Sequence, residues 1–205
     1  MKNTTKRIIG FVLQLASVGV LVLIDRLIKN VAAEKLIGGG TVVLIKGVLG
    51  LTYAENTGAA FSMFNTSTNV LSVVTGVVMA VGLVLLFVIK NKPKIYDICI
   101  PLIIAGGMGN LLDRLTRGYV IDYIRTLFID FPIFNFADIL ITCACFAIII
   151  YLIYEMVTDS RKAKAEKAAA ETISATKDEN EAADETKAEK PEHEKSENTA
   201  DGEVK

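Results

Sequence analysis

Histidine is almost absent from this sequence of 205 residues. The only one, His193, lies in a charged C-terminal stretch, well beyond the last apolar segment. A catalytic serine or cysteine needs a nearby base, most often histidine, and histidine is also a common metal ligand. The sequence therefore argues against a serine–histidine or cysteine–histidine enzyme and against a histidine-ligated metal.

Cysteine is also scarce, and the three that occur, Cys99, Cys143 and Cys145, all lie inside apolar runs. In such surroundings cysteine behaves as a small hydrophobic residue. The spacing of these residues matches no metal-binding motif and no disulfide framework. The chain has no basic stripe interleaved with aromatic residues either, so no nucleic acid is expected as a partner.

Charge is present but unevenly spread, in a chain that is 52% hydrophobic and 22% charged. Residues 158–205 carry 14 acidic and 9 basic side chains, whereas residues 1–157 carry 9 acidic and 13 basic ones. The C-terminal stretch has too little apolar surface to bury, so we expect a disordered cytoplasmic tail whose first turns can prolong the preceding helix. The expected division is a membrane domain, residues 1–157, and a tail, residues 158–205.

Four long apolar runs account for the hydrophobic content: residues 8–24, 70–89, 95–112 and 134–157. Runs of about 20 apolar residues match the thickness of a bilayer core. So short a chain could not cover four of them in water, so we predict four transmembrane helices. The basic start and the first run look like a signal peptide, but Asp25-Arg26 follows in place of a small-residue cleavage site. We therefore expect this run to be retained as the first span.

Two β-prone pieces, residues 41–45 and 47–53, lie between the first two spans and are rich in Val, Leu, Ile and Tyr. Glycine separates them, a pattern that predicts short strands. The predicted fold class is an all-α membrane protein. It has four transmembrane helices and a small extracytoplasmic β-rich cradle between helices 1 and 2, lying on the membrane surface.

Short basic segments set the expected orientation. They occur at residues 2–7, in the turn at residues 90–94 and just after the fourth run, which all fall on one side of a four-span protein. By the positive-inside rule that side is the cytoplasm, where both termini are expected. The outer face then collects the polar residues Asp25, Asn56, Asp113, Asp122 and Asp138.

Carboxylates are left as the candidate reactive groups, namely Asp25, Asp113, Asp122, Asp130 and Asp138. Two aspartates held close together share one proton, so one can act as a base while the other acts as an acid. Such a pair can activate a water against a peptide carbonyl. We predict that Asp122 and Asp138 meet in this way. An alternative is that these acids are only caps and dipole partners at helix ends, with Asp113 held by an arginine.

Five short motifs are arranged in one order along the chain, with the apolar runs between them. They are Asp25 with Lys29, Glu55-Asn56-Thr57-Gly58-Ala59-Ala60-Phe61-Ser62, Gly106-Gly107-Met108-Gly109-Asn110-Leu111-Leu112-Asp113-Arg114, Val120-Ile121-Asp122-Tyr123, and Phe134-Asn135-Phe136-Ala137-Asp138. In this combination the chain resembles the lipoprotein signal peptidases (signal peptidase II), which are bacterial membrane aspartic endopeptidases. The resemblance covers residues 10–154.

This resemblance implies a role for each matched position. Asp122 and Asp138 match the catalytic pair. The polar shell that holds this pair and the substrate backbone is matched by Asn56, Asn110, Arg114 and Asn135. Asp25 matches an acidic residue with a supporting role at the outer end of the first span, and Asp113 is expected to support the fold.

The resemblance also implies the partners and the location. The substrates would be prolipoproteins that carry a diacylglyceryl-modified cysteine, and the cut would fall just before that cysteine. Membrane lipids would surround the protein, no metal or organic cofactor is implied, and the enzyme is expected to act as a monomer. It would lie in the bacterial cell membrane with its active site at the outer leaflet.

Some positions depart from the family pattern. Arg26 stands where the family often has glutamine, Phe136 stands where valine is frequent, and Ile139 and Leu140 replace a more polar continuation. Two other classes stay open. A small proton-coupled transporter or channel would have acids spread through the membrane depth. A non-catalytic lipoprotein binder would keep its function after both Asp122 and Asp138 were replaced.

Overall fold

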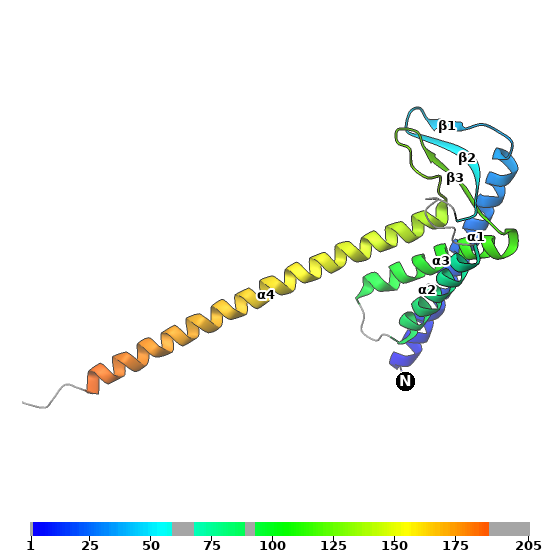
Figure 1. Ribbon diagram of the computed structural model, residues 1–205. Coiled ribbons are helices and arrows are strands. Elements are labelled where there is room, and N and C mark those ends of the chain that lie inside the picture. Colours follow the sequence, from blue (N-terminus) through cyan, green and yellow to red (C-terminus); the bar gives the residue numbers. More distant parts are fainter. Residues whose placement is uncertain (1, 59–67, 89–92, 189–205) are drawn as a thin grey trace, which may run out of the picture. The chain divides into compact units, whose positions relative to one another are not determined.

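The computed structural model describes residues 2–58, 68–88 and 93–188. Along the chain (Figure 1) the elements are α1 (Lys2–Leu36), β1 (Val42–Ile45), β2 (Leu49–Asn56), α2 (Thr68–Val88), α3 (Lys94–Arg117), β3 (Val120–Thr126) and α4 (Phe136–Ala188). Within these residues, four helices are long and apolar enough to cross a membrane, which confirms the predicted number of spans. The motif residues 59–62, most of the basic turn and His193 lie outside the described residues.

Helix α1 continues about three turns beyond the apolar run at residues 8–24. Its last part is polar in sequence, yet Ala32 and Leu36 are buried there against Ile121 and Tyr123 of β3. Packing against the strands therefore stabilises the extension, as tertiary contacts commonly do for amphipathic helix ends. The same extension carries Asp25 and Lys29, which are both buried.

The strands form one antiparallel sheet in the order β1-β2-β3. We expected two strands, both between the first and second helices, and the structure adds a third. β3 comes from between α3 and α4, and its residues 120–123 are buried on both faces. A strand covered on both faces shows no clean alternation, so its β-branched and aromatic content was the only local signal.

Gly118 ends α3 and starts the turn into β3. Its φ of 84° is in the left-handed region, and its N–H donates to the carbonyl oxygen of Arg114 over 3.1 Å. Glycine is favoured at this position because a side chain would be strained there. The chain enters β3 two residues later, which brings Asp122 back beside the end of α3.

The helices pack closely where α3 carries glycine. A Cβ on Gly106 would meet the backbone of Ala137 and the side chain of Ile141 in α4, and one on Gly107 would lie 3.2 Å from Met79 Sδ in α2. Apolar side chains such as Val73, Phe87 and Ile98 are exposed on the outside of the helices. Small residues at contacts and apolar residues outside are typical of helices that pack in lipid.

The chain divides into two compact units, Met1–Ile153 and Tyr154–Lys205. The second unit begins inside α4, which runs through the charged stretch to Ala188. The helix is longer than the few turns expected beyond residue 157. The first part of the tail that we expected to be disordered is therefore helical. Ala, Glu and Lys are strong helix formers, which accounts for the difference. Disorder stays a prediction for residues 189–205, which lie outside the described residues.

Candidate active site

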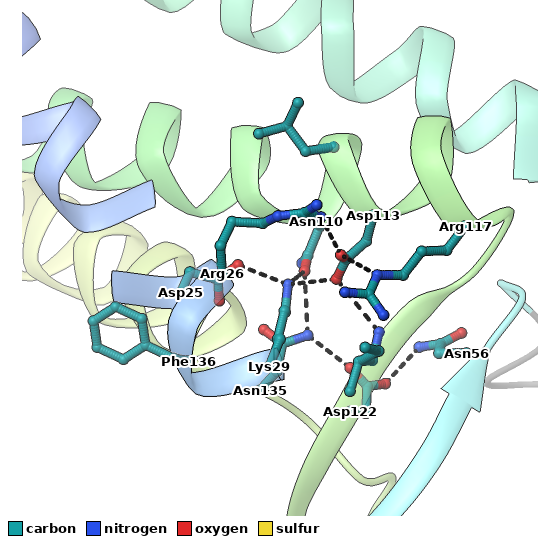
Figure 2. A network of polar contacts seen from close by, with 12 residues as sticks. Asp25, Arg26, Lys29, Asn56, Asn110, Asp113, Arg117, Asp122, Asn135 and Phe136 are labelled. Carbon is teal, nitrogen blue, oxygen red and sulfur yellow. Dashed lines mark hydrogen bonds and ion pairs between the residues drawn. The ribbon is translucent and has the colours of Figure 1, made fainter. Parts of the chain in front are cut away.

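Asp122 is buried in the middle of β3 between two asparagine side chains. Asn56 Nδ2 donates to Asp122 Oδ2 over 2.9 Å, and Asn135 Nδ2 donates to Asp122 Oδ1 over 2.6 Å. Figure 2 shows these two amides approaching the carboxylate from opposite sides. Each oxygen of Asp122 therefore accepts a hydrogen bond from a neutral donor, which satisfies the buried group.

An irregularity in β2 puts Asn56 on the correct face of the sheet. Leu51 pairs with Ile124, but Ala54 pairs with Asp122, so β2 contains one more residue than β3 between these pairs. Side chains alternate between faces, so an extra residue reverses the face of everything that follows it. Without this bulge the side chain of Asn56 would lie on the face opposite to that of Asp122.

Asn135 is brought to Asp122 by the chain segment that precedes α4. Phe134 pairs with Ile124 of β3, with backbone N···O distances of 3.1 Å and 2.8 Å. The backbone N–H of Phe136 donates to the Tyr123 hydroxyl over 3.2 Å. These bonds hold the start of α4 against β3, so residues that are thirteen apart in sequence become neighbours.

Asp138 lies in the first turn of α4 and is bonded to Asn135 in both directions. Asn135 N–H donates to Asp138 Oδ2 over 3.0 Å, and Asp138 N–H donates to Asn135 Oδ1 over 3.1 Å. This reciprocal arrangement is a helix cap, the alternative considered from the sequence. The other carboxylate oxygen of Asp138, Oδ1, accepts a hydrogen bond of 2.8 Å from Asn110 Nδ2 of α3. Asp138 thus takes part in the cap of α4 and also contacts Asn110 of α3.

Asn135 therefore bridges the two aspartates, since both carboxylates accept hydrogen bonds from it. Burial raises the pKa of Asp122 to about 6, although the amides of Asn56 and Asn135 favour its ionised form. The nearby charge of Asp138 contributes to this rise. The arrangement gives one carboxyl group that releases its proton at about pH 6, beside a second carboxyl group.

A second polar cluster, around Lys29, joins α1 to α3 (Figure 2). Lys29 Nζ lies 2.8 Å from Asp25 Oδ2, 3.1 Å from Asp113 Oδ2 and 2.8 Å from Asn110 Oδ1. Asp113 is also 2.7 Å from Arg26 and 3.5 Å from Arg117. The ion pair of Asp25 is short but poorly aligned, because neither oxygen has a hydrogen bond of good geometry among the described residues.

The structure brings most of the predicted residues into one region. Asn56, Asn110 and Asn135 contact the predicted catalytic aspartates directly. Asp25 and Asp113 belong to the polar cluster around Lys29. Arg114 lies among the charges of Asp113, Asp122 and Asp138, and its Nε atom is buried without a hydrogen bond in the described part of the chain. Asp130 is exposed in the loop after β3. No site role was predicted for Lys29 or Arg117, because pairing across α1 and α3 leaves no local pattern.

Among the described residues, no group of three or more His, Cys, Asp and Glu side chains is arranged to hold a metal ion. The two aspartates are surrounded by amide donors and by apolar residues such as Val120 and Ala137, which are buried. Carboxyl groups in such surroundings are suited to giving and taking protons.

The fold and the site together define a multi-pass membrane protein with two aspartates held by one asparagine at the meeting point of a strand and two helices. Comparison with known sequences gives the family. The model of the family described as "Signal peptidase (SPase) II" matches residues 17–154. The chain belongs to the signal peptidase II family, a family of membrane proteases that remove signal peptides.

Two relatives of similar sequence identity to this chain, and one solved structure, support this assignment. The chain is 38% identical over 144 residues to the lipoprotein signal peptidase of Clostridium tetani, covering 69% of this chain and 92% of that protein. It is also 38% identical over 144 residues to the lipoprotein signal peptidase of Latilactobacillus sakei, covering 68% and 94%. A solved bacterial membrane enzyme superposes with a TM-score of 0.63 at 27% identity, covering 70% of this chain and 88% of the other.

Proposed function

We propose that this protein is an aspartic endopeptidase that removes signal peptides from diacylglyceryl-modified prolipoproteins, cutting just before the lipid-modified cysteine. Asp122 and Asp138 are the proposed catalytic pair. The observation that carries the proposal is the bridge through Asn135, which gives each aspartate a hydrogen bond from the same residue. The names of the relatives supply the substrate class.

In the proposed reaction one carboxylate takes a proton from a water molecule while the water oxygen bonds to the scissile carbonyl carbon. The other carboxyl group gives its proton to the carbonyl oxygen. The first carboxyl group then gives the proton it took from water to the leaving amine as the carbon–nitrogen bond breaks. The second carboxylate takes a proton from a hydroxyl group of the tetrahedral intermediate, which restores the pair. Asn56, Asn110 and Asn135 hold the carboxylates, and Arg114 and the same amides are proposed to hold the substrate backbone.

The membrane context supports a lipid-bearing substrate. The sheet and the site lie together where α1, α3 and the start of α4 meet (Figure 1), at one end of apolar helices. A cleavage site that carries lipid chains stays at the membrane surface, where helix ends are found. We propose that this end is the outer face, that both termini are cytoplasmic and that the enzyme acts as a monomer.

A proton-coupled transporter is favoured less by the distribution of charge. Between Asp97 and Asp113, α3 carries no Asp, Glu, Lys or Arg residue. A proton relay needs titratable groups through the depth of the membrane. Here the acids of the site gather at one end of α3 instead.

The substrate proposal is tested with purified protein in lipid vesicles. We expect cleavage of a diacylglyceryl-modified prolipoprotein immediately before the modified cysteine, as read by mass spectrometry of both products. A matched precursor with serine in place of that cysteine cannot be lipidated and is expected to stay intact. Equal cleavage of both precursors would refute the substrate class, and binding without cleavage would favour the non-catalytic binder.

The pH dependence follows from the raised pKa of Asp122. A pair that shares a proton works only while one of its carboxyl groups is protonated. With a pKa of about 6, Asp122 loses this proton as the pH rises, so kcat/KM is expected to fall through that region. The corresponding fall in kcat is expected at higher pH, because bound substrate removes more water from around Asp122. A kcat/KM that keeps rising from pH 6 to 8 would show that Asp122 works in its ionised form.

The charged tail is proposed to be dispensable. Deleting residues 177–205 removes only part of the second unit and no residue of the site. We expect the truncated protein to keep activity within about twofold of the full chain, as is usual for changes away from packed features. A large loss of turnover at unchanged protein level would show that the tail contributes to the reaction.

A further inference from the structure

Lys29 has a role that neither the family name nor the proposed catalytic pair assigns. We infer that Lys29 is a positioning residue, whose buried ammonium group fixes the orientation of the Asn110 amide and thereby the hydrogen bonding of Asp138. This inference rests on the proposed function, because it concerns the same two aspartates.

Lys29 is buried among polar groups of α1 and α3. The side chain is 1% exposed, donates a hydrogen bond to Asn110 and forms ion pairs with Asp25 and Asp113. An ammonium group has three N–H donors and no acceptor. Lys29 can therefore meet Asn110 only as a donor.

The position of Lys29 leaves Asn110 one favourable amide orientation. Because the ammonium can only donate, the amide must present its oxygen to Lys29, at 2.8 Å. The amide nitrogen then points to Asp138 Oδ1, also at 2.8 Å. A reversed amide would place two donors against each other and would turn an acceptor toward a carboxylate.

The same oxygen of Asn110 also accepts a bond of 3.2 Å from Asn135 Nδ2. Asn135 donates from this nitrogen to Asp122 as well, over 2.6 Å. Lys29 is therefore connected through Asn110 to Asp138 and, through Asn135, to Asp122. Figure 2 shows this path of dashed contacts from Lys29 toward Asp122.

Charged groups from several elements surround Lys29. Asp25 on α1 and Asp113 on α3 face it, and Arg26 and Arg117 pair with Asp113. On the other side lie Asp122 of β3 and Asp138 of α4, and Lys29 is among the charges that favour ionisation of Asp122. Removing its charge should therefore move the titration of Asp122 to higher pH.

The first test replaces Lys29 with methionine, which has a similar length and no charge. Lys29→Met is expected to lower kcat about 10- to 100-fold, the range seen when groups that orient a reacting shell are lost, with a smaller change in KM. The fall of kcat/KM on the alkaline side is expected to move up by about 0.5 to 1 pH unit. Lys35→Met, at an exposed position of the same helix, is the matched control and should change neither.

The second test uses chemical rescue and does not depend on the stability of one variant. Lys29→Ala lacks three methylene groups and the ammonium group of the lysine side chain. Together the missing groups match propylammonium. Adding propylammonium during purification and assay is expected to restore at least a tenth of the lost activity and the original pH limb. Neutral propanol at the same concentration should restore neither, because it carries no charge.

The outcomes separate this inference from the proposed function. The positioning role would be overturned if the fall of kcat/KM in Lys29→Met did not move in pH. It would also be overturned if propylammonium did not restore the activity of Lys29→Ala. Either result would count even if Asp122→Asn is inactive. Activity that survives in Asp122→Asn would instead overturn the proposed function. A variant whose lost activity simply follows its lost folded fraction would assign Lys29 to the fold alone.

Discussion

Replacement of Asp122 or Asp138 with asparagine is expected to lower turnover of a lipid-modified prolipoprotein by about a thousandfold or more, the scale for losing one of two groups that act as a unit. Asparagine keeps the size of the side chain and can still contact Asn135, so the fold should tolerate the change. It cannot take or release the proton that the proposed reaction moves between water, carboxyl group and substrate.

The variants also test whether the two aspartates act together. If they do, the double variant should be about as inactive as each single one, because removal of either group already disables the pair. Asp130→Asn is the matched control, since Asp130 is an exposed aspartate in the loop after β3. Cleavage by Asp122→Asn or Asp138→Asn at the rate of this control would remove that residue from the mechanism.

The sequence predicted the spans because their signal is local. Each apolar run is long enough to cross a bilayer, and the length of a run does not depend on its neighbours. The prediction that Asp122 and Asp138 form a pair rests on carboxylate chemistry and on motif order, and the structure places Asn135 in contact with both. The cap formed by Asn135 and Asp138 was visible as a spacing of three residues, although spacing could not separate a cap from a reactive group.

What the sequence did not predict depends on contacts between distant segments. β3 was missed because both of its faces are buried, and the bulge in β2 is defined only by its pairing with β3. Lys29 contacts Asp25 within α1, but its contacts with Asn110 and Asp113 join positions more than eighty residues apart, which no local pattern contains. Its neighbour Arg26, a departure from the family pattern, forms a 2.7 Å ion pair with Asp113, so the arginine is accommodated.

A methyl group at Gly106 is expected to disable the enzyme without touching a polar residue. Its Cβ would meet the backbone oxygen of Ala137 and lie 2.7 Å from Ile141 Cγ1, both in α4. A backbone atom cannot rotate away, so the first turn of α4 must shift, and Asn135 and Asp138 with it. We expect Gly106→Ala to lose about 1 to 3 kcal/mol of stability by overpacking. Displacement of the pair by about 1 Å should lower turnover about 100-fold.

Gly76→Ala is the control for this change, because it makes the same substitution in a membrane helix without a neighbour. A Cβ on Gly76 of α2 meets nothing within 4 Å among the described residues. Alanine should therefore leave activity unchanged and favour the helix by about 0.5 to 1 kcal/mol. Thermal unfolding and turnover, measured in the same detergent, separate the two effects. Normal turnover in a stably folded Gly106→Ala variant would mean that α4 can move without displacing the pair, and the close approach at Gly106 would then have no part in holding the site.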